Sequence, residues 1–116
     1  NKRDKKFIAV TSTDSVKHVL HMMKDLDISQ LPVTKDEVIV GSVTESNILE
    51  FILTNPLHNS EKHVSEIMAA PFPKVSIDLP VKDLNKYISK NTPAVIAEDR
   101  SGDLIVLTQY DIIQAL

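Results

Sequence analysis

The chain has 116 residues, of which 42% are hydrophobic and 25% charged, and its formal net charge is −3 at pH 7. These values are ordinary for a globular domain, and basic residues cluster only at the start of the chain, which excludes the broad basic face of a nucleic-acid reader. No segment approaches the run of about 18 apolar residues that crosses a bilayer. We therefore expect a cytoplasmic protein without nucleic-acid or membrane partners.

Cysteine and glycine usage excludes further classes of site. The chain contains no cysteine, so it has no disulfides, thiolate metal sites or thiol catalysis. Its two glycines, Gly41 and Gly102, are too few for a glycine-rich nucleotide loop. The start, NKRDKKFIAV, lacks the long apolar stretch of a secretory signal and does not begin with methionine. We therefore expect a piece of a longer chain, or a processed one.

The first half is predicted to form a strand, a helix, two strands and a second helix. After a short strand over 7–10, Asp14-Ser15 is a helix-start signal. Apolar residues at helical spacing then predict one buried face: Val16, Val19, Leu20, Met23 and Leu26. Strands over 30–34 and 38–43 flank the turn KDE and predict a hairpin. The closing helix carries Ile48, Leu49 and Ile52.

The second half repeats this order. Val10 aligns with Val75 and Thr44 with Thr108, at offsets of 65 and 64 residues. The repeat predicts strands over 74–77, 94–97 and 104–107, a helix carrying Val81, Leu84, Tyr87 and Ile88, and a helix carrying Ile112, Ile113 and Leu116. Between the copies lies TNPLHNSEKH (54–63), in which Asn55-Pro56 is predicted to end a helix.

These elements predict an α/β (α+β) fold of two β-α-β-β-α motifs. We divide the chain into residues 1–58 and residues 59–116, the latter beginning with the linker. A unit of about 55–60 residues buries too little of its surface to be stable alone. Two such units packed by their sheets would share a core, with pseudo-two-fold symmetry, and would leave clefts between the halves where ligands commonly bind.

The motifs resemble those of a known family. ISQLPV (28–33) followed by VIVGSVTESNILEFI (38–52) is similar to the CBS motif, and VSEIMAAPFPKVSIDLPV (64–81), NTPAVIAED (91–99) and IVLTQYDIIQAL (105–116) form a more diverged second copy. A pair of CBS motifs is a Bateman module. GSVTESN and IMAAPFP are most similar to the C-terminal regulatory region of cystathionine β-synthase-type pyridoxal-phosphate enzymes.

The resemblance implies a regulatory segment rather than an enzyme. Such modules bind an adenosyl ligand (S-adenosylmethionine, AMP or ATP) between their motifs and modulate an attached or partner enzyme by allostery, here a cystathionine β-synthase-like lyase. They also form homodimers through the paired motifs. A ligand-free dimerisation or interaction module is the alternative. No further cofactor is implied.

Thr108 and Asp111 are the leading candidates for ligand binding. A carboxylate can accept both hydroxyl hydrogens of a ribose diol, a threonine hydroxyl can donate or accept beside it, and a helix start favours an anion. The same Thr-x-x-Asp spacing is typical of a capping box, so both roles stay open. Thr44 and Asn47 hold the equivalent places in the first copy, and the uncharged Asn47 predicts a weaker diol site.

In the family each cleft also uses residues of the opposite copy. The resemblance therefore implies two sets of site residues: Thr108 and Asp111 with Thr11, Ile28, Gln30 and Leu31, and Thr44 and Asn47 with Phe72, Asn91, Thr92 and Ala94. Ile28 and Phe72 would sandwich an adenine, although plain core packing explains them equally well. The family's motif has a glycine three residues before the threonine, and Gly41 matches it in the first copy. In the second copy Ile105 takes that position, and its side chain would crowd a phosphate.

The ligand class is narrowed by charge. A polyphosphate ligand requires cations beside the residues that bind it. The residues next to the two threonines are Glu45 and Ser46 in the first copy and Gln109 and Tyr110 in the second, and none of them is a cation. Only Lys5 and Lys6 could supply positive charge. S-adenosylmethionine or AMP is therefore favoured over ATP.

Metal binding and catalysis are not predicted. His18 and His21 lie three apart on a helix but have no third ligand. No nucleophile is paired with a base, so we expect no catalytic site.

Overall fold

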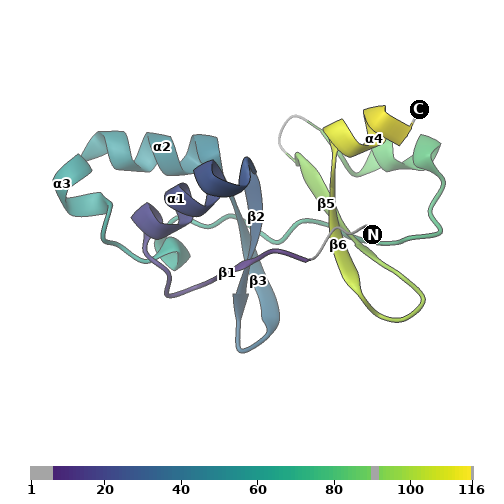
Figure 1. The fold of residues 1–116 in the computed structure, drawn as a ribbon, viewed down its shortest axis with the longest axis horizontal. Coiled ribbons are helices and arrows are strands. Elements are labelled where there is room, and N and C mark those ends of the chain that lie inside the picture. The colour runs from purple at the N-terminus through teal and green to yellow at the C-terminus, as the bar shows by residue number, and fades with distance from the viewer. Residues whose placement is uncertain (1–6, 90–91, 116) are drawn as a thin grey trace. The chain divides into compact units, whose positions relative to one another are not determined.

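The computed structural model describes residues 7–89 and 92–115. Its contacts divide the chain into two units (Figure 1): a first unit, Ala9–Pro71, and a second unit made of the described residues from Phe72 onward together with Phe7 and Ile8. Each unit contains one three-stranded sheet. The contact boundary lies after Pro71, whereas the sequence repeat was divided after residue 58, and that repeat boundary stays a prediction.

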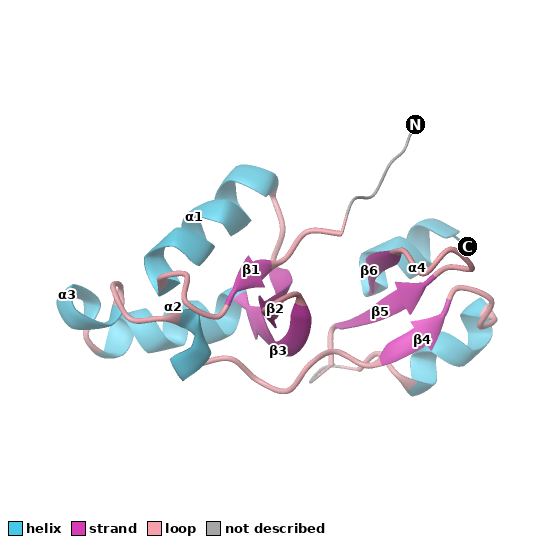
Figure 2. Cartoon of the chain, turned by 90° about the horizontal axis from the view of Figure 1, so that it is seen from below, coloured by secondary structure: helices cyan, strands magenta, loops and turns pink. Residues whose placement is uncertain are grey.

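The first unit has the predicted order of elements. They are β1 (Val10–Thr11), α1 (Val16–Leu26), β2 (Gln30–Lys35), β3 (Val38–Thr44), α2 (Glu45–Thr54), α3 (Pro56–Asn59) and the 3-10 helix η1 (Val64–Glu66). Strand β2 lies in the middle of the sheet, parallel to β1 and antiparallel to β3. Helices α1 and α2 both lie on one side of this sheet (Figure 2).

Local sequence explains the helix α1. The Ser15 hydroxyl accepts a hydrogen bond from the N–H of His18 at 3.0 Å, which caps the first turn. The apolar face contributes Val16, Val19 and Met23 to the core of the first unit, whereas Leu26 of the predicted face is 46% exposed. The other apolar side chains of this core that are at most 1% exposed are Val10, Leu31, Val33, Val43, Ile48 and Val64. The helix ends at Leu26, and the residue that caps it, Asp27, has a left-handed conformation with a φ of 54°. The predicted helix is thereby confirmed.

The segment predicted to link the copies has structure of its own. Helix α2 ends at Thr54, next to the predicted Asn55-Pro56 stop. Asn59 of α3 is buried, and its side-chain amide donates to the carbonyl of Phe51 and the hydroxyl of Thr54, each at 2.9 Å. The N–H of Val16 donates to the carbonyl of Lys62 at 2.8 Å. These bonds join the segment to the first unit.

The second unit repeats the topology of the first with one exception. It contains β4 (Lys74–Ser76), the 3-10 helix η2 (Val81–Lys86), β5 (Ala94–Glu98), β6 (Leu104–Thr108) and α4 (Gln109–Ala115). Strand β5 is central, parallel to β4 and antiparallel to β6. The prediction of an α-helix at 81–88 is wrong, because the segment forms a 3-10 helix. The mixed α+β class is confirmed, and Leu116 lies outside the described residues.

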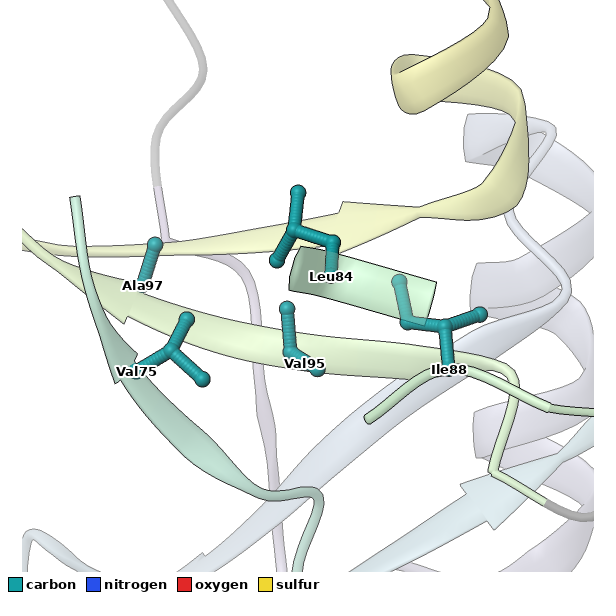
Figure 3. Packing of buried hydrophobic residues seen from close by; sticks show 5 residues of the cluster. All are labelled: Val75, Leu84, Ile88, Val95 and Ala97. Carbon is teal, nitrogen blue, oxygen red and sulfur yellow. The ribbon is translucent and has the colours of Figure 1, made fainter. Parts of the chain in front are cut away.

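The second unit contains a cluster of buried apolar residues. Val75, Leu84, Ile88, Val95 and Ala97 form its buried part (Figure 3), and Leu79, Ile105, Leu107 and Ile112 pack against it.

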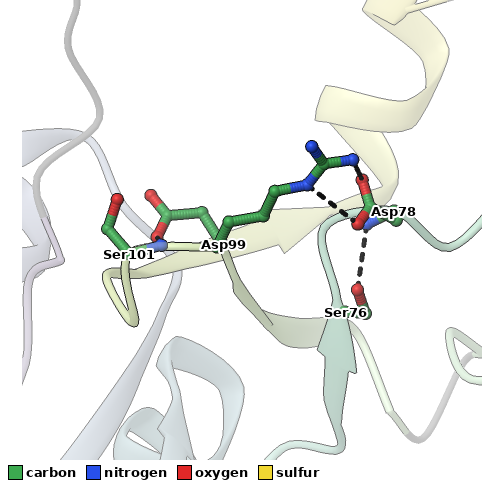
Figure 4. Close-up of polar contacts among 5 residues, drawn as sticks. Ser76, Asp78, Asp99 and Ser101 are labelled. Atoms are coloured by element: carbon green, nitrogen blue, oxygen red, sulfur yellow. Dashed lines mark hydrogen bonds and ion pairs between the residues drawn. The ribbon is translucent and has the colours of Figure 1, made fainter.

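Polar contacts order the turn between β5 and β6. Asp99 accepts a hydrogen bond from the N–H of Ser101 at 2.8 Å, and Arg100 contacts Asp78 at 3.4 Å (Figure 4). Asp99 also accepts a hydrogen bond from the N–H of Asp103 at 2.9 Å. The Arg100–Asp78 pair is exposed and therefore stabilises little. Over the described residues, no helix has the length and apolar character needed to cross a bilayer.

Candidate functional site

Thr108 and Asp111 meet where β6 passes into α4, and we call this place the second junction. Oδ2 of Asp111 accepts hydrogen bonds from the backbone N–H of Thr108 at 2.9 Å and from its hydroxyl at 3.1 Å. In return the N–H of Asp111 donates to the hydroxyl oxygen of Thr108 at 3.4 Å. This reciprocal pairing is a capping box. Both residues are half-buried.

Thr44 and Asn47 form the equivalent first junction between β3 and α2. The Thr44 hydroxyl donates to Oδ1 of Asn47 at 2.7 Å, and the N–H of Asn47 donates to the Thr44 hydroxyl oxygen at 3.2 Å. The two junctions therefore share a local geometry but differ in charge. The capping interaction predicted as one alternative is present at both, and the ligand role stays a prediction.

Three other predicted site residues lie near one another in the first unit. Gln30 is the direct partner of Thr44 across β2 and β3. Ile28 is half-buried and lines a surface hollow of about 330 Å³, together with Met23, Lys24, Asp27, Ser29 and Glu45. Leu31, by contrast, is 1% exposed and paired with Val43, which favours the core-packing alternative for its side chain. Thr11 is exposed in β1, and its N–H donates to the Asp14 carboxylate at 2.9 Å.

Corresponding residues meet in the second unit. Ala94 is the direct partner of Thr108 across β5 and β6, and the half-buried Thr92 precedes β5. Phe72 is 6% exposed, which again favours packing over ligand contact. Asn91 lies outside the described residues. The combination of residues from both copies into one cleft stays a prediction.

Gly41 is required by the chain's own packing. A Cβ atom at this position would lie 2.6 Å from the sulfur of Met68 and 2.9 Å from the carbonyl oxygen of Ala69. Ile105, which takes the glycine's place in the second unit, packs against that unit's core. The difference between Gly41 and Ile105 thus has a reason that involves no ligand.

The segment Met68–Ala70, which we call the strap, lies along the outer edge of β3. Ser42 and Ala69 exchange two backbone hydrogen bonds of 2.9 and 2.8 Å, and the Ser42 hydroxyl donates to the carbonyl of Ala70 at 2.6 Å. One feature of the sequence indicates this contact. Gly41 faces a stretch in which two alanines follow Met68, and small residues of this kind permit close backbone approach.

Comparison with known proteins identifies the fold. Residues 3–54 match the protein family described as CBS domain, and no curated protein matches the sequence. Among solved structures, a CBS-domain-containing protein from Agrobacterium tumefaciens superposes with a TM-score of 0.83 at 16% identity, covering 97% of this chain and 86% of the other. A conserved CBS domain protein of unknown function from Thermoplasma acidophilum gives 0.77 at 24% identity, covering 97% and 66%.

A third structure carries a ligand. The protein CBSX2, a CBS-pair protein known from Arabidopsis thaliana, was solved in complex with AMP, and it superposes with a TM-score of 0.72 at 21% identity, covering 94% of this chain and 86% of the other. These identities are low, so the likeness concerns the fold. Residues 3–54 of the chain therefore match the CBS domain family, and the chain is similar in fold to CBS-pair proteins.

Proposed function

We propose that this chain is a regulatory module that binds an adenosyl ligand at the second junction and thereby biases an attached or partner enzyme. One observation carries the proposal: a half-buried hydroxyl and carboxylate, Thr108 and Asp111, are already hydrogen-bonded to each other at a strand-to-helix junction. That the fold is shared with a protein solved with AMP supports the choice of ligand.

The capping box does not conflict with ligand binding. A carboxylate has about four lone-pair positions, so ribose hydroxyls can share Asp111 with the cap or replace the hydroxyl of Thr108. Bonds to a charged acceptor are stronger than bonds between neutral groups. The first junction offers the amide of Asn47 instead, so we assign it the weaker binding.

Regulation follows if the ligand prefers one arrangement of the module. A ligand can shift a conformational equilibrium only by its difference in affinity between the two states. We propose S-adenosylmethionine or AMP as the ligand, a homodimer as the working form and the cytoplasm as its location. None of the structures compared above concerns a cystathionine β-synthase, so that kind of attached enzyme rests on the sequence resemblance.

Thermal unfolding tests the proposal. A ligand present at a hundred times its Kd stabilises the native state by about 2.7 kcal/mol, so AMP, adenosine or S-adenosylmethionine at millimolar concentration should raise Tm. Asp111→Asn should weaken binding by roughly 1–2 kcal/mol, because a charged acceptor becomes neutral. Asp103→Asn, in the same unit but outside the junction, is the matched control. If none of these compounds moves Tm, the interaction-only alternative is favoured.

A separate observation supports the interaction-only alternative. Leu49 and Leu53 lie one turn apart on α2 and form an apolar stripe, 41% and 74% exposed, and Leu57 of the next helix, α3, is 95% exposed. Such an apolar stripe is typical of a protein–protein contact. Replacing Leu53 and Leu57 by glutamate should convert a dimer into monomers in analytical ultracentrifugation, since two charges would be buried. An unchanged sedimentation coefficient would show that this stripe forms no dimer contact.

A further inference from the structure

We propose that Met68 is a site of oxidative modification, at which a peroxide converts the thioether to a sulfoxide and so releases the strap from the outer edge of β3. The proposal is independent of ligand binding and concerns residues of the first unit alone. Three observations carry it: the packing of the Met68 side chain, the small number of contacts that hold the strap, and the position of the strap in the chain.

The side chain of Met68 lies over the backbone of Gly41. A Cβ atom on Gly41 would lie 2.6 Å from the Met68 sulfur and 2.9 Å from its Cγ atom. The thioether therefore occupies the space that a side chain at this position of β3 would need. Met68 is half-buried rather than buried, so a solute as small as hydrogen peroxide can reach it from the solvent side.

Few contacts hold the strap in place. Ala69 and Ser42 exchange two backbone hydrogen bonds, the Ser42 hydroxyl donates to the Ala70 carbonyl, and the N–H of Met68 donates to the carbonyl of Val64 at 3.0 Å. The pairing is an isolated bridge, and Ala69 and Ala70 are exposed. Because the other two residues of the strap are alanines, Met68 supplies its large apolar contact with β3.

Oxidation changes the character of this contact. The sulfur lone pair attacks one oxygen of hydrogen peroxide, and an S–O bond forms as the O–O bond breaks. The departing hydroxide takes the proton of the transferred OH group and leaves as water. The sulfur loses the two electrons that the peroxide gains, and an apolar, flexible side chain becomes a polar sulfoxide.

The sulfoxide does not fit the position of the thioether. It carries one more heavy atom on the sulfur, which already lies too close to Gly41 to admit a Cβ atom between them. Its oxygen also requires hydrogen-bond partners or water, since an unpaired polar group is costly to bury. We therefore expect oxidised Met68 to turn toward solvent and to separate the adjacent Ala69 from Ser42.

Release of the strap affects two parts of the module at once. Ser42 lies two residues before Thr44, in the strand that ends at the first junction. In the other direction, the strap leads within two residues to Phe72, where the chain enters the second unit. Oxidation of Met68 therefore frees both the outer edge of β3 and the segment that joins the two units, which makes the module responsive to peroxide.

Peroxide treatment followed by amide hydrogen exchange tests the proposal. Met23 is 1% exposed, so peptide mass spectrometry should show Met68 oxidised at least about tenfold faster than Met23. In the same samples the amides of Ser42 and Ala69 should exchange about tenfold faster than in the untreated chain. Methionine sulfoxide reductase, with a dithiol as reductant, should restore slow exchange. Oxidation of Met68 no faster than that of Met23, or unchanged exchange at Ser42 after Met68 is oxidised, overturns the proposal.

Three variants separate this site from general oxidative damage. Met68→Leu keeps an apolar side chain without sulfur, so exchange at Ser42 should be slow and should not respond to peroxide. Met68→Gln is polar like the sulfoxide and should exchange fast at Ser42 without peroxide. Met22→Leu is the matched control, because Met22 is also half-buried but lies on α1, and it should leave the peroxide response unchanged. A response that persists in Met68→Leu, or slow exchange in Met68→Gln, contradicts the proposed role of Met68.

Discussion

At the scale of single residues, the two junctions differ by one substitution in the same geometry. Thr44 and Thr108 each accept a hydrogen bond from a helix N–H, so capping explains both hydroxyls. Asp111 adds a charge that Asn47 lacks, and it also accepts a hydrogen bond from the N–H of its own threonine, Thr108. A ligand at the second junction must therefore compete with a working cap. This competition limits affinity and makes Asp111→Asn informative for both stability and binding.

The hairpin turn between β2 and β3 contains avoidable strain. Asp36 and Glu37 have φ values of 51° and 66°, as the two central residues of a type I′ turn require. Aspartate tolerates this left-handed conformation better than glutamate does. Glu37→Gly should therefore stabilise the protein by about 1 kcal/mol, measured as an increase in the urea midpoint of unfolding.

Alanine at the same position provides the control. Glu37→Ala removes the same charge but keeps a Cβ atom, so it should give little gain. If both variants stabilise the chain equally, the charge rather than the backbone conformation is responsible.

At the scale of elements, the sequence predicts what local signals determine. Helix α1 has a serine cap and buries Val16, Val19 and Met23 of its predicted apolar face, and both hairpins pair as their turns indicate. The prediction of an α-helix over 81–88 is wrong because only Leu84 and Ile88 of the predicted apolar face are buried. Val81 and Tyr87 are 41% and 40% exposed. With so small a buried face, little favours the α-helix over the 3-10 helix.

In the candidate site, too, features set by local sequence are predictable, whereas contacts between distant residues are not. The junction residues and their strand partners, such as Gln30 opposite Thr44, follow from repeat and hairpin register. The strap could not be predicted in this way, because it joins Ser42 to a residue far along the chain. Local sequence patterns do not predict a contact between residues so far apart in the chain. The one local sign of it is the glycine that makes room for the strap.

The strap makes Gly41 a sensitive position. Gly41→Ala places a Cβ atom 2.6 Å from the Met68 sulfur, so side chain and strap must move. Overpacking of this kind costs about 1–3 kcal/mol, which urea denaturation would measure.

A double-mutant cycle identifies the contact responsible. Met68→Ala should recover part of the loss caused by Gly41→Ala, because the nearest atom is then absent. Recovery should be incomplete, since the Ala69 carbonyl at 2.9 Å remains. Strictly additive effects would show that Met68 does not oppose the new methyl group.

At the scale of the whole molecule, the two units have unequal cores. In the first unit nine apolar side chains are at most 1% exposed: Val10, Val16, Val19, Met23, Leu31, Val33, Val43, Ile48 and Val64. In the second unit Val75, Leu84 and Ile88 retain 8%, 5% and 6% exposure, and two of the fully buried residues, Ala94 and Ala97, are small. Because stabilisation scales with buried apolar area, the first unit should be the more stable.

Native-state hydrogen exchange would measure this difference in stability. Amides of β2 and β5, the central strands, should exchange with protection factors that differ by at least about tenfold in favour of β2, because local unfolding can open the second unit alone. Addition of a ligand that binds the second junction should narrow the gap, since binding stabilises the weaker unit. Equal protection of β2 and β5 at every urea concentration would mean that the units unfold together, and that ligand binding acts on the whole module as one cooperative body.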